Sequence, residues 1–396
     1  MSKNISILGS TGSIGRQALE IVRSDSDLRA VALAARSDIR KLKDQIYEFR
    51  PRMVCVYDRD KMDELYQELR QEAVLSAKDM PELVSGMEGL CKAASFDEAD
   101  TSLISVVGMI GIRPTIAAIR AHKKIALANK ETLVCAGHII MPMVREEGVE
   151  LMPIDSEHSA IYQCLMGEEH ESISRILLTA SGGPFRGKKR EELSSVGPED
   201  ALRHPNWSMG AKITIDSATM VNKALEVMEA RWLFDVGIDQ IDPIIQPRSI
   251  IHSMVEFRDG AIKAQLGAPS MLVPIAFSLY APKRPPIPSE PKLDLLEVSS
   301  ISFEKPDMDT FKGLALGIEA GKQGGLMPTV FNAANEEAVS LFLGKKIGFL
   351  DIADGIGAAM QRATDKRDPE LSDILMTEEW SRSFIRQYFN IGEQRI

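Results

Sequence analysis

The stretch Ile5-Ser6-Ile7-Leu8-Gly9-Ser10-Thr11-Gly12-Ser13-Ile14-Gly15 decides the fold of the first part of the chain. Its first four residues predict a strand, and the glycines predict a tight turn into a helix from about Ser13 to Arg23. Glycines let a backbone approach a pyrophosphate, and a helix N-terminus offers free N–H groups to its charge. The stretch therefore predicts a dinucleotide site, with an ordinary glycine-rich turn as the alternative.

Short apolar runs continue the strand pattern after this turn. They lie at residues 30–34, 53–56, 103–107 and 124–128, and helical patterns separate them. Such alternation is typical of a parallel sheet covered by helices. We therefore expect an α/β nucleotide-binding domain over residues 1–150.

The rest of the chain divides at a run of prolines. Residues 151–280 predict an α+β domain, with strands at 173–179, 212–215 and 249–257. Five prolines between residues 281 and 291 begin a stiff linker, which we place at 281–309. Residues 310–396 predict a helical domain, with helices at 310–322, 328–343, 350–364 and 377–389.

Composition limits the classes of function. A length of 396 residues predicts two or three domains, and a net charge of -10 argues against general nucleic-acid binding. No apolar run approaches the roughly 20 residues of a membrane span, and the start of the chain shows no signal-peptide pattern. Four scattered cysteines, without a Cys-x-x-Cys pair, indicate free thiols in a reducing compartment. We expect a cytoplasmic protein that binds neither nucleic acid nor membrane.

The residues after the second strand indicate which dinucleotide binds. An NAD enzyme usually places an acidic residue there, to bind the ribose 2′-hydroxyl. Here Arg36 and Ser37 come first, which suits the 2′-phosphate of NADP. Asp38 follows them closely and keeps NAD as the alternative.

Three carboxylates predict a metal site. Asp155 and Glu157 follow the apolar residues 151–154, and Glu226 lies in a helical stretch. Repelling charges at the end of a buried strand need a cation, and oxygen ligands without cysteine favour Mg²⁺ or Mn²⁺ over zinc. His158 either contacts these ligands without binding the metal itself or has a structural role.

A phosphate site and a lid are predicted nearby. Ser217, Asn222 and Lys223 offer donors that suit a phosphate, and Lys130 follows a strand whose carboxyl end faces a ligand crevice. The polar segment 185–209 lies between glycines, as lids often do. We expect its Trp207 to close over a ligand, with packing on its own domain as the alternative, and its His204 to contact substrate or order the loop.

Taken in order, these motifs resemble the 1-deoxy-D-xylulose 5-phosphate reductoisomerase family of the non-mevalonate isoprenoid pathway. The similarity covers nearly the whole length and is carried by residues 9–15, 128–131, 155–158, 181–185, 204–210, 216–226 and 332–336. The chain departs from the family pattern at Arg36-Ser37-Asp38, where Gly-Lys-Asn is frequent, and at Met109-Ile110, where smaller residues are frequent.

The resemblance implies a homodimer with a Rossmann-like NADPH-binding domain, a connective catalytic domain and a C-terminal helical domain. It implies metal ligation by Asp155, Glu157 and Glu226, and conversion of 1-deoxy-D-xylulose 5-phosphate to 2-C-methyl-D-erythritol 4-phosphate with NADPH and Mn²⁺ or Mg²⁺. The implied substrate-site residues are Lys130, Ser156, Ser181, His204, Ser217, Asn222 and Lys223, to which the lid argument adds Trp207. The implied NADPH-site residues are Thr11, Gly12, Ser13, Ile14, Asn129, Glu131 and Gly210, to which the 2′-phosphate argument adds Arg36 and Ser37.

Two other functions compete with this interpretation. One is a homoserine or semialdehyde dehydrogenase-like enzyme, but the latter needs a nucleophilic cysteine and none lies between residues 204 and 226. The other is a nucleotide sensor with a helical interaction module, which has no need of three carboxylates and a phosphate site.

Overall fold

The computed structural model describes residues 3–72, 74–203, 205–207, 209–287 and 289–391. The chain forms two compact units. Unit 1 contains Met1–Thr132, Ile140–Ser159 and Met271–Glu290, and unit 2 contains Leu133–Ile139, Ala160–Ser270 and Pro291–Ile396. All four cysteines are free thiols, as predicted.

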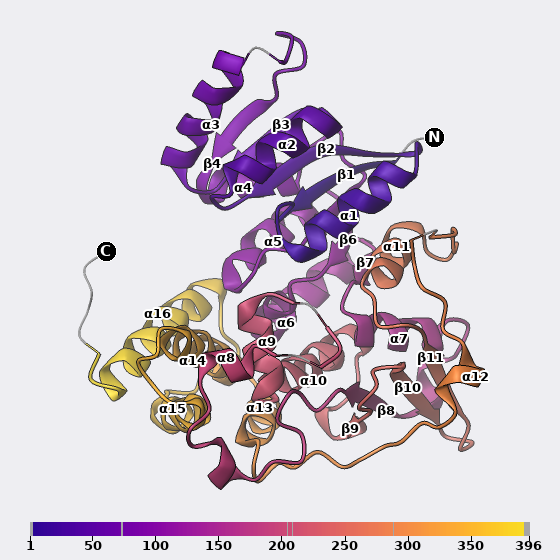
Figure 1. Ribbon diagram of the computed structural model, residues 1–396, viewed down its shortest axis with the longest axis vertical. Helices are drawn as coiled ribbons and strands as arrows, with labels where there is room; N and C mark the ends of the chain where they lie inside the picture. The colour runs from indigo at the N-terminus through magenta and orange to yellow at the C-terminus, as the bar shows by residue number, and fades with distance from the viewer. Residues whose placement is uncertain (1–2, 73, 204, 208, 288, 392–396) are drawn as a thin grey trace. The chain divides into compact units, whose positions relative to one another are not determined.

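Unit 1 is built on a parallel sheet of seven strands in the order β4-β3-β2-β1-β5-β6-β7 (Figure 1). Every neighbouring pair is parallel, which confirms the predicted α/β class. The chain runs outward from β1 to β4 and then returns to place β5 beside β1, so the strand order reverses next to β1. The strands are β1 Lys3–Leu8, β2 Leu28–Ala35, β3 Met53–Val56, β4 Glu82–Ser85, β5 Thr101–Ile104, β6 Lys124–Leu127 and β7 Leu151–Pro153.

Helices connect the strands of unit 1, as the alternating pattern predicts. The predicted helix after the glycine turn is α1 Ser13–Ser24, which buries Ala18, Leu19 and Val22. The other helices are α2 Ile39–Phe49, α3 Arg59–Glu72, α4 Gly86–Ala94, η1 Met109–Gly111, α5 Ile112–Arg120, α6 Lys130–Glu146 and, much later in the chain, α11 Leu272–Tyr280. Helices α6 and α7 Ser156–Leu165 each contain residues of both units.

Unit 2 contains a mixed sheet of four strands in the order β11-β10-β8-β9. The strand β8 Ile173–Ala180 pairs in parallel with β9 Ile241–Ile245 and antiparallel with β10 Ile251–Phe257. The strand β11 Ile262–Leu266 pairs antiparallel with β10 and forms one edge of the sheet. The sheet confirms the strands predicted at 173–179 and 249–257.

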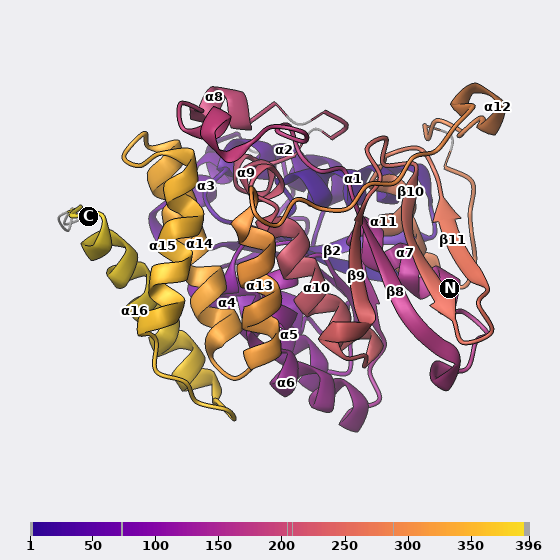
Figure 2. The same cartoon turned by 90° about the horizontal axis from the view of Figure 1, so that it is seen from below.

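The long helices of unit 2 lie side by side next to this sheet (Figure 2). They are α10 Val221–Phe234, α13 Lys312–Gln323, α14 Met327–Leu343, α15 Phe349–Arg362 and α16 Leu371–Tyr388. The last four confirm the predicted helices beyond the prolines, although α16 starts earlier than expected. The short elements are η2 His170–Ser172, η3 Arg190–Leu193, α8 Pro198–Ala201, η4 Ile238–Gln240 and α12 Leu295–Val298.

The predicted strand at residues 212–215 was wrong. These residues belong to the helix α9 Ala211–Ala218, which Gly210 precedes as N-cap. The alternation of lysine, isoleucine, threonine and isoleucine favours a strand locally, but a run of four residues is too short to distinguish the alternating pattern of a strand from the pattern of a helix. Lys212 and Asp216 lie one helical turn apart, and the ion pair between Lys212 Nζ and Asp216 Oδ2, at 2.9 Å, stabilises the helix instead.

A search of the described helices for one long and apolar enough to cross a membrane finds none.

Candidate active site

The glycine turn of unit 1 has the geometry that a dinucleotide site needs. Gly9 follows β1 with φ +89, and a Cβ there would lie 2.6 Å from the carbonyl oxygen of Ser105. A Cβ on Gly15 would lie 2.3 Å from the Gly9 carbonyl oxygen, so both positions require glycine. Gly12 is the N-cap of α1 and makes no side-chain capping bond. The turn lies where the strand order reverses, which is where α/β sheets bind ligands.

The residues that line this turn are accessible. Gly12 and Ser13 are exposed, and Thr11 and Ile14 are half-buried. Ser10 is buried and its hydroxyl donates to Gln45 Oε1 at 2.8 Å, while Gln45 Nε2 donates to the Ser10 carbonyl at 2.9 Å. These two bonds hold the turn from inside the unit and leave its outer N–H groups to face a phosphate.

The end of β2 presents an exposed cation. Arg36 and Ser37 are both exposed, and Arg36 Nε lies 3.9 Å from Asp58 Oδ1. Asp38 instead caps α2, because its carboxylate accepts from Lys41 N at 3.2 Å and from Lys41 Nζ at 2.6 Å. The hydrogen bond from the Lys41 side chain lowers the pKa of Asp38. Asp38 therefore has a structural partner already, whereas the exposed Arg36 side chain forms a long ion pair with Asp58.

Asn129 joins two loops at the carboxyl ends of β5 and β6. It caps α6 by accepting from Thr132 N, and its Nδ2 donates to the carbonyls of Val106 at 2.8 Å and Gly108 at 2.9 Å. The same Nδ2 donates to Glu131 Oε2 at 3.0 Å. Both Asn129 and Glu131 are buried. The buried amide thus fixes the two loops that border the predicted cofactor site.

Asp155 organises the acidic segment of unit 1. It follows β7, and its carboxylate lies 3.1 Å from Lys130 Nζ and 3.1 Å from His158 Nδ1. The same carboxylate accepts from Glu157 N at 3.1 Å, which places Glu157 beside it in the first turn of helix α7. Ser156 donates to Glu157. The structure thus brings Lys130, Asp155, Ser156 and Glu157 together, and His158 supports Asp155 from a fully buried position.

A second cluster lies on the first turn of α10 in unit 2. Asn222 Nδ2 and Lys223 Nζ both donate to the carboxylate of Glu226. Lys223 and Glu226 are almost completely buried, with 3% and 1% of each residue exposed. Positions one turn apart on a helix share a face, which is why these three side chains meet. The cluster places an amide, an ammonium group and a carboxylate within one helical turn.

The loop after β8 lies against the helix that carries Ser217. Ser181 Oγ accepts from Gly183 N at 3.2 Å. A Cβ on Gly183 would lie 2.6 Å from the Ser217 carbonyl oxygen, and its φ is +69, so only glycine fits there. Ser217 is followed within a few residues by Asn222 and Lys223. Unit 2 therefore gathers Ser181, Ser217, Asn222 and Lys223, although sequence gave no signal for the role of Gly183.

The predicted lid has more structure than its polar sequence suggests. Phe185 is buried and packs edge-on against Phe349 with ring centroids 5.1 Å apart, and Leu193 is fully buried. The residues between them are mostly exposed and form ion pairs, such as Arg190 with Asp354 at 3.0 Å. The segment also contains η3 and α8. Its first half is therefore anchored to unit 2.

The end of this segment lies beside the sheet of unit 2. Asn206 Nδ2 donates to the Pro247 carbonyl and to Ser249 Oγ, both at 2.8 Å. Trp207 is half-buried, and its ring lies 6.4 Å from that of His252. Burial lowers the pKa of His252, so this ring is neutral near pH 7. Gly210 is exposed. His204, a predicted substrate residue, lies outside the described residues.

Comparison with known proteins identifies the family. The family model of 1-deoxy-D-xylulose 5-phosphate reductoisomerase matches residues 5–137, and two models of C-terminal domains of the same enzyme match residues 151–234 and 266–384. The reductoisomerase of Lachnospira eligens is 55% identical over 95% of this chain and 97% of its own length. That of Agathobacter rectalis is 52% identical over 97% of this chain and 99% of its own length.

Solved structures agree with the sequence relatives. The reductoisomerase of Zymomonas mobilis, in complex with NADPH, superposes with a TM-score of 0.90 at 38% identity and covers 98% of this chain and 99% of its own. Another reductoisomerase, in complex with NADPH, fosmidomycin and magnesium, has a TM-score of 0.92 at 38% identity and covers 98% of each chain. The chain therefore belongs to the 1-deoxy-D-xylulose 5-phosphate reductoisomerase family.

Proposed function

We propose that this chain uses NADPH and a divalent metal ion to convert 1-deoxy-D-xylulose 5-phosphate to 2-C-methyl-D-erythritol 4-phosphate. Its family membership supports the reaction, and relatives have been solved with NADPH, magnesium and fosmidomycin. The observation that carries the proposal is the set formed by the half-buried Asn222 and the buried Lys223 and Glu226, because phosphate donors and a hard oxygen ligand occupy one turn of α10.

The proposed metal ligands are Asp155, Glu157 and Glu226. Carboxylate oxygens are the ligands that Mg²⁺ and Mn²⁺ prefer, so the donor chemistry fits either ion. Lysine side chains compensate the charges of Asp155 and Glu226 within their own units. When bound, the ion would polarise the carbonyl and hydroxyl oxygens of the sugar and stabilise developing negative charge.

The remaining polar residues would hold the substrate in place. Lys223 and Asn222 donate to phosphate and sugar oxygens, and Ser181 and Ser217 add hydroxyl donors from the neighbouring loop and helix. Lys130 and Ser156 orient the sugar backbone, and His204 adds a further contact. An ammonium group carries three N–H donors, so Lys223 would contact both Glu226 and the oxyanion of the substrate.

The glycine turn would bind the pyrophosphate of NADPH through the backbone of Thr11, Gly12, Ser13 and Ile14. Asn129, Glu131 and Gly210 would line the rest of the cofactor site, and Arg36 and Ser37 would bind the 2′-phosphate. The cofactor supplies the hydride, whereas the protein determines its placement and excludes water.

The test of the proposed reaction is NADPH oxidation with 1-deoxy-D-xylulose 5-phosphate, with and without added Mg²⁺ or Mn²⁺. We expect turnover only with metal, and Glu226→Gln should lower it at least about 100-fold, because several kcal/mol of charge stabilisation are lost. NADPH affinity, measured by fluorescence titration, should not change. Glu256→Gln, which removes the charge of a half-buried carboxylate paired with Arg175, is the matched control. Normal turnover of Glu226→Gln at limiting metal would remove Glu226 from the metal site.

A second prediction concerns the choice of cofactor. Arg36→Ala should raise the KM for NADPH about tenfold or more and leave that for NADH unchanged, because a hydrogen bond to a charged group contributes roughly 1.5–3 kcal/mol. The nearby exposed Arg40→Ala is the control. An unchanged ratio of the two KM values in Arg36→Ala would show that another residue binds the 2′-phosphate.

The proposal includes a lid over residues 185–209. Phe185 and Leu193 anchor its first half, so closure is concentrated in the part that follows the buried Ala201. Trp207 would leave the neighbourhood of His252 and cover the bound sugar phosphate. Its closing would exclude water from a reactive intermediate.

Limited trypsin digestion tests the lid. Cleavage after the exposed Arg203 should be fast in the free protein and slow with NADPH, magnesium and fosmidomycin, while cleavage at the exposed Lys78 should not change. Trp207→Ala should raise the substrate KM about 10- to 100-fold, since burying a large side chain contributes roughly 1.5–3 kcal/mol. Equal cleavage at Arg203 in both states would contradict the lid.

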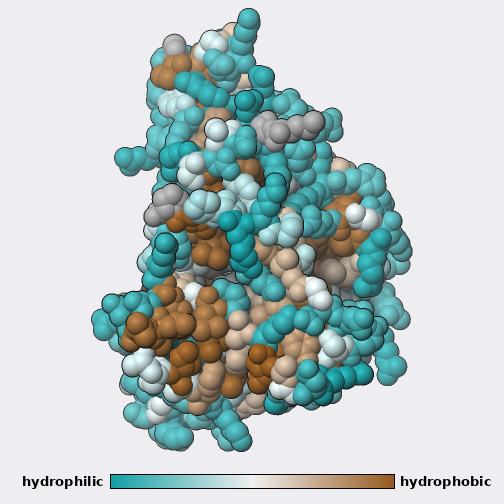
Figure 3. Space-filling view, turned by 90° about the vertical axis from the view of Figure 1, so that its right-hand side faces the viewer, coloured by the Kyte–Doolittle hydropathy of each residue, from teal (hydrophilic) through white to brown (hydrophobic). Residues whose placement is uncertain are grey.

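We also propose a homodimer formed through the edge strand β11. An edge strand presents unpaired backbone groups, and Ile262, Ala264 and Leu266 put exposed side chains on one face of it. Figure 3 views the molecule from the side on which Figure 1 draws β11, and hydrophobic side chains gather on the lower part of that face. Pairing the β11 strands of two chains would cover both the unpaired backbone groups and the exposed apolar side chains.

Light scattering tests the dimer. The wild type should have about twice the chain mass of 43.7 kDa, and the double variant Ile262→Lys, Leu266→Lys should be monomeric, because like charges face each other across the paired edges. Leu296→Lys, at an exposed leucine outside the sheet, should remain dimeric. A monomeric wild type at micromolar concentration would refute the homodimer.

The proposed location is the cytoplasm. Cys55, Cys135 and Cys164 are buried as free thiols, and burial raises the pKa of Cys55 to about 12 and that of Cys164 to about 11. Reduced thiols suit a reducing compartment. Recovery of the protein in an extracytoplasmic fraction would contradict this location.

A further inference from the structure

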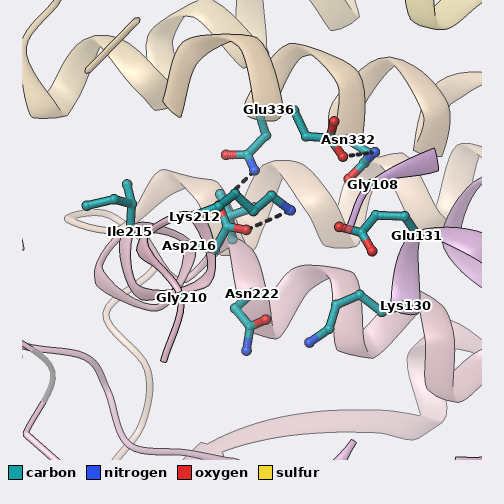
Figure 4. A network of polar contacts seen from close by, with 12 residues as sticks. Gly108, Lys130, Glu131, Gly210, Lys212, Ile215, Asp216, Asn222, Asn332 and Glu336 are labelled. Carbon is teal, nitrogen blue, oxygen red and sulfur yellow. Dashed lines mark hydrogen bonds and ion pairs between the residues drawn. The ribbon is translucent and has the colours of Figure 1, made fainter. Parts of the chain in front are cut away.

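A buried carboxylate lies next to the proposed phosphate site. Asp216 precedes Ser217 on α9, and only 1% of it is exposed. Its carboxylate lies 2.9 Å from Lys212 Nζ and accepts a hydrogen bond from Asn335 Nδ2 at 2.8 Å. Figure 4 shows Lys212 and Asp216 facing each other below helix α14, which supplies Asn335. The amide thus links a helix near the end of the chain to the helix that carries Ser217.

The chain turns sharply directly after Asp216. The hydroxyl of Thr219 donates to the Ile215 carbonyl at 3.1 Å and to the Asp216 carbonyl at 3.2 Å, which ends α9. Met220 then takes a left-handed conformation with φ 62, and α10 begins at Val221. The orientation of α9 therefore determines where the first turn of α10, with Asn222 and Lys223, points.

Helix α13 holds this corner from another side. A Cβ on Gly313 would lie 2.7 Å from the Thr219 carbonyl oxygen and 2.7 Å from Val221 Cγ2. The close approach prevents the corner from moving toward α13. The contact of Asp216 with Asn335 opposes a rotation of α9 about its own axis, because it ties a side chain of α9 to a different helix.

Asn335 lies on a buried polar face of α14 together with Thr329 and Asn332, all fully buried. Within the described chain, the Oδ1 atom of Asn335 has no hydrogen-bond partner. An unsatisfied buried acceptor costs roughly 1–3 kcal/mol, so this amide lowers the stability of the fold compared with an apolar residue at the same position. Its Nδ2, by contrast, makes a bond to a charged acceptor. The position is therefore explained by donation to Asp216 and not by packing.

We infer that Asn335 is a positioning residue for the substrate phosphate: through Asp216 it fixes the rotation of α9 and so the placement of Ser217, Asn222 and Lys223. The inference rests on the proposed function only for the identity of the ligand. The ligand class is a phosphate monoester or a phosphonate. Lys212 lies on α9 itself, so its ion pair with Asp216 compensates the charge of the carboxylate and leaves the rotation of the helix to the contact with Asn335.

The test compares three variants with the wild type. Asn335→Leu keeps the volume and removes the donor; Asn335→Asp places two carboxylates face to face; and Asp216→Asn combined with Asn335→Asp exchanges the partners. Thr329→Val is the control, because it removes an equally buried polar atom of α14 that has no described partner. The measurements are KM and kcat for the sugar phosphate, calorimetric Kd for inorganic phosphate, Kd for NADPH, and the unfolding midpoint.

We expect Asn335→Leu to raise both the KM and the inorganic-phosphate Kd about tenfold, with kcat and NADPH affinity much less affected. Asn335→Asp should be worse, and the exchanged pair should recover most of the phosphate affinity. If Asn335→Leu does not fold, Asn335→Ser serves in its place. Thr329→Val should bind phosphate as the wild type does.

Three results in the variants would overturn the inference. They are an unchanged phosphate Kd in folded Asn335→Leu, an equal loss of phosphate and NADPH affinity, and an exchanged pair that binds phosphate no better than Asn335→Asp. A wild type that binds no inorganic phosphate would do the same. A wild type that binds phosphate but does not turn over the sugar phosphate would refute the proposed reaction alone, and the comparison of phosphate affinities would still decide the role of Asn335.

Discussion

A carboxylate cannot be buried without compensation for its charge, and this constraint shapes each part of the candidate site. Asp155 pairs with Lys130, Glu226 with Lys223, and Asp216 with Lys212. Each pair lies within one unit, so each of these carboxylates has a cationic partner in its own unit. In the proposed reaction, an arriving divalent ion or phosphate would meet these lysine–carboxylate pairs and would exchange partners with a lysine.

The sequence predicted the parts of the fold that depend on local patterns. The glycine turn, the parallel sheet and the helices beyond the prolines follow from spacing within short windows. The predicted strand at residues 212–215 failed because its outcome depends on Asp216, whose second partner, Asn335, lies 119 residues away. The short strand β9 and the exposed β11 gave too weak a pattern, since neither alternates cleanly between buried and exposed positions.

The candidate site shows the same division. Spaced glycines, as around Gly12, and clustered charges, as around Asp155 and Lys223, carry a chemical signal that can be read without coordinates. Residues that act through another residue carry none. Nothing in the sequence shows that Gly183 must approach the Ser217 carbonyl, or that Asn335 faces Asp216, because those contacts exist only after distant elements have packed.

Helix α11 has a consequence for the synthesis of the protein. It follows the whole sheet of unit 2 in sequence, yet it packs in unit 1 against α1, β6 and β7, where Leu272, Ile275 and Leu279 join the apolar core. A nascent chain that has just completed β7 therefore still exposes the apolar surface that α11 will cover. More than a hundred residues must leave the ribosome before that surface is closed, so the first unit to begin folding is not complete until the strands of the second have been made.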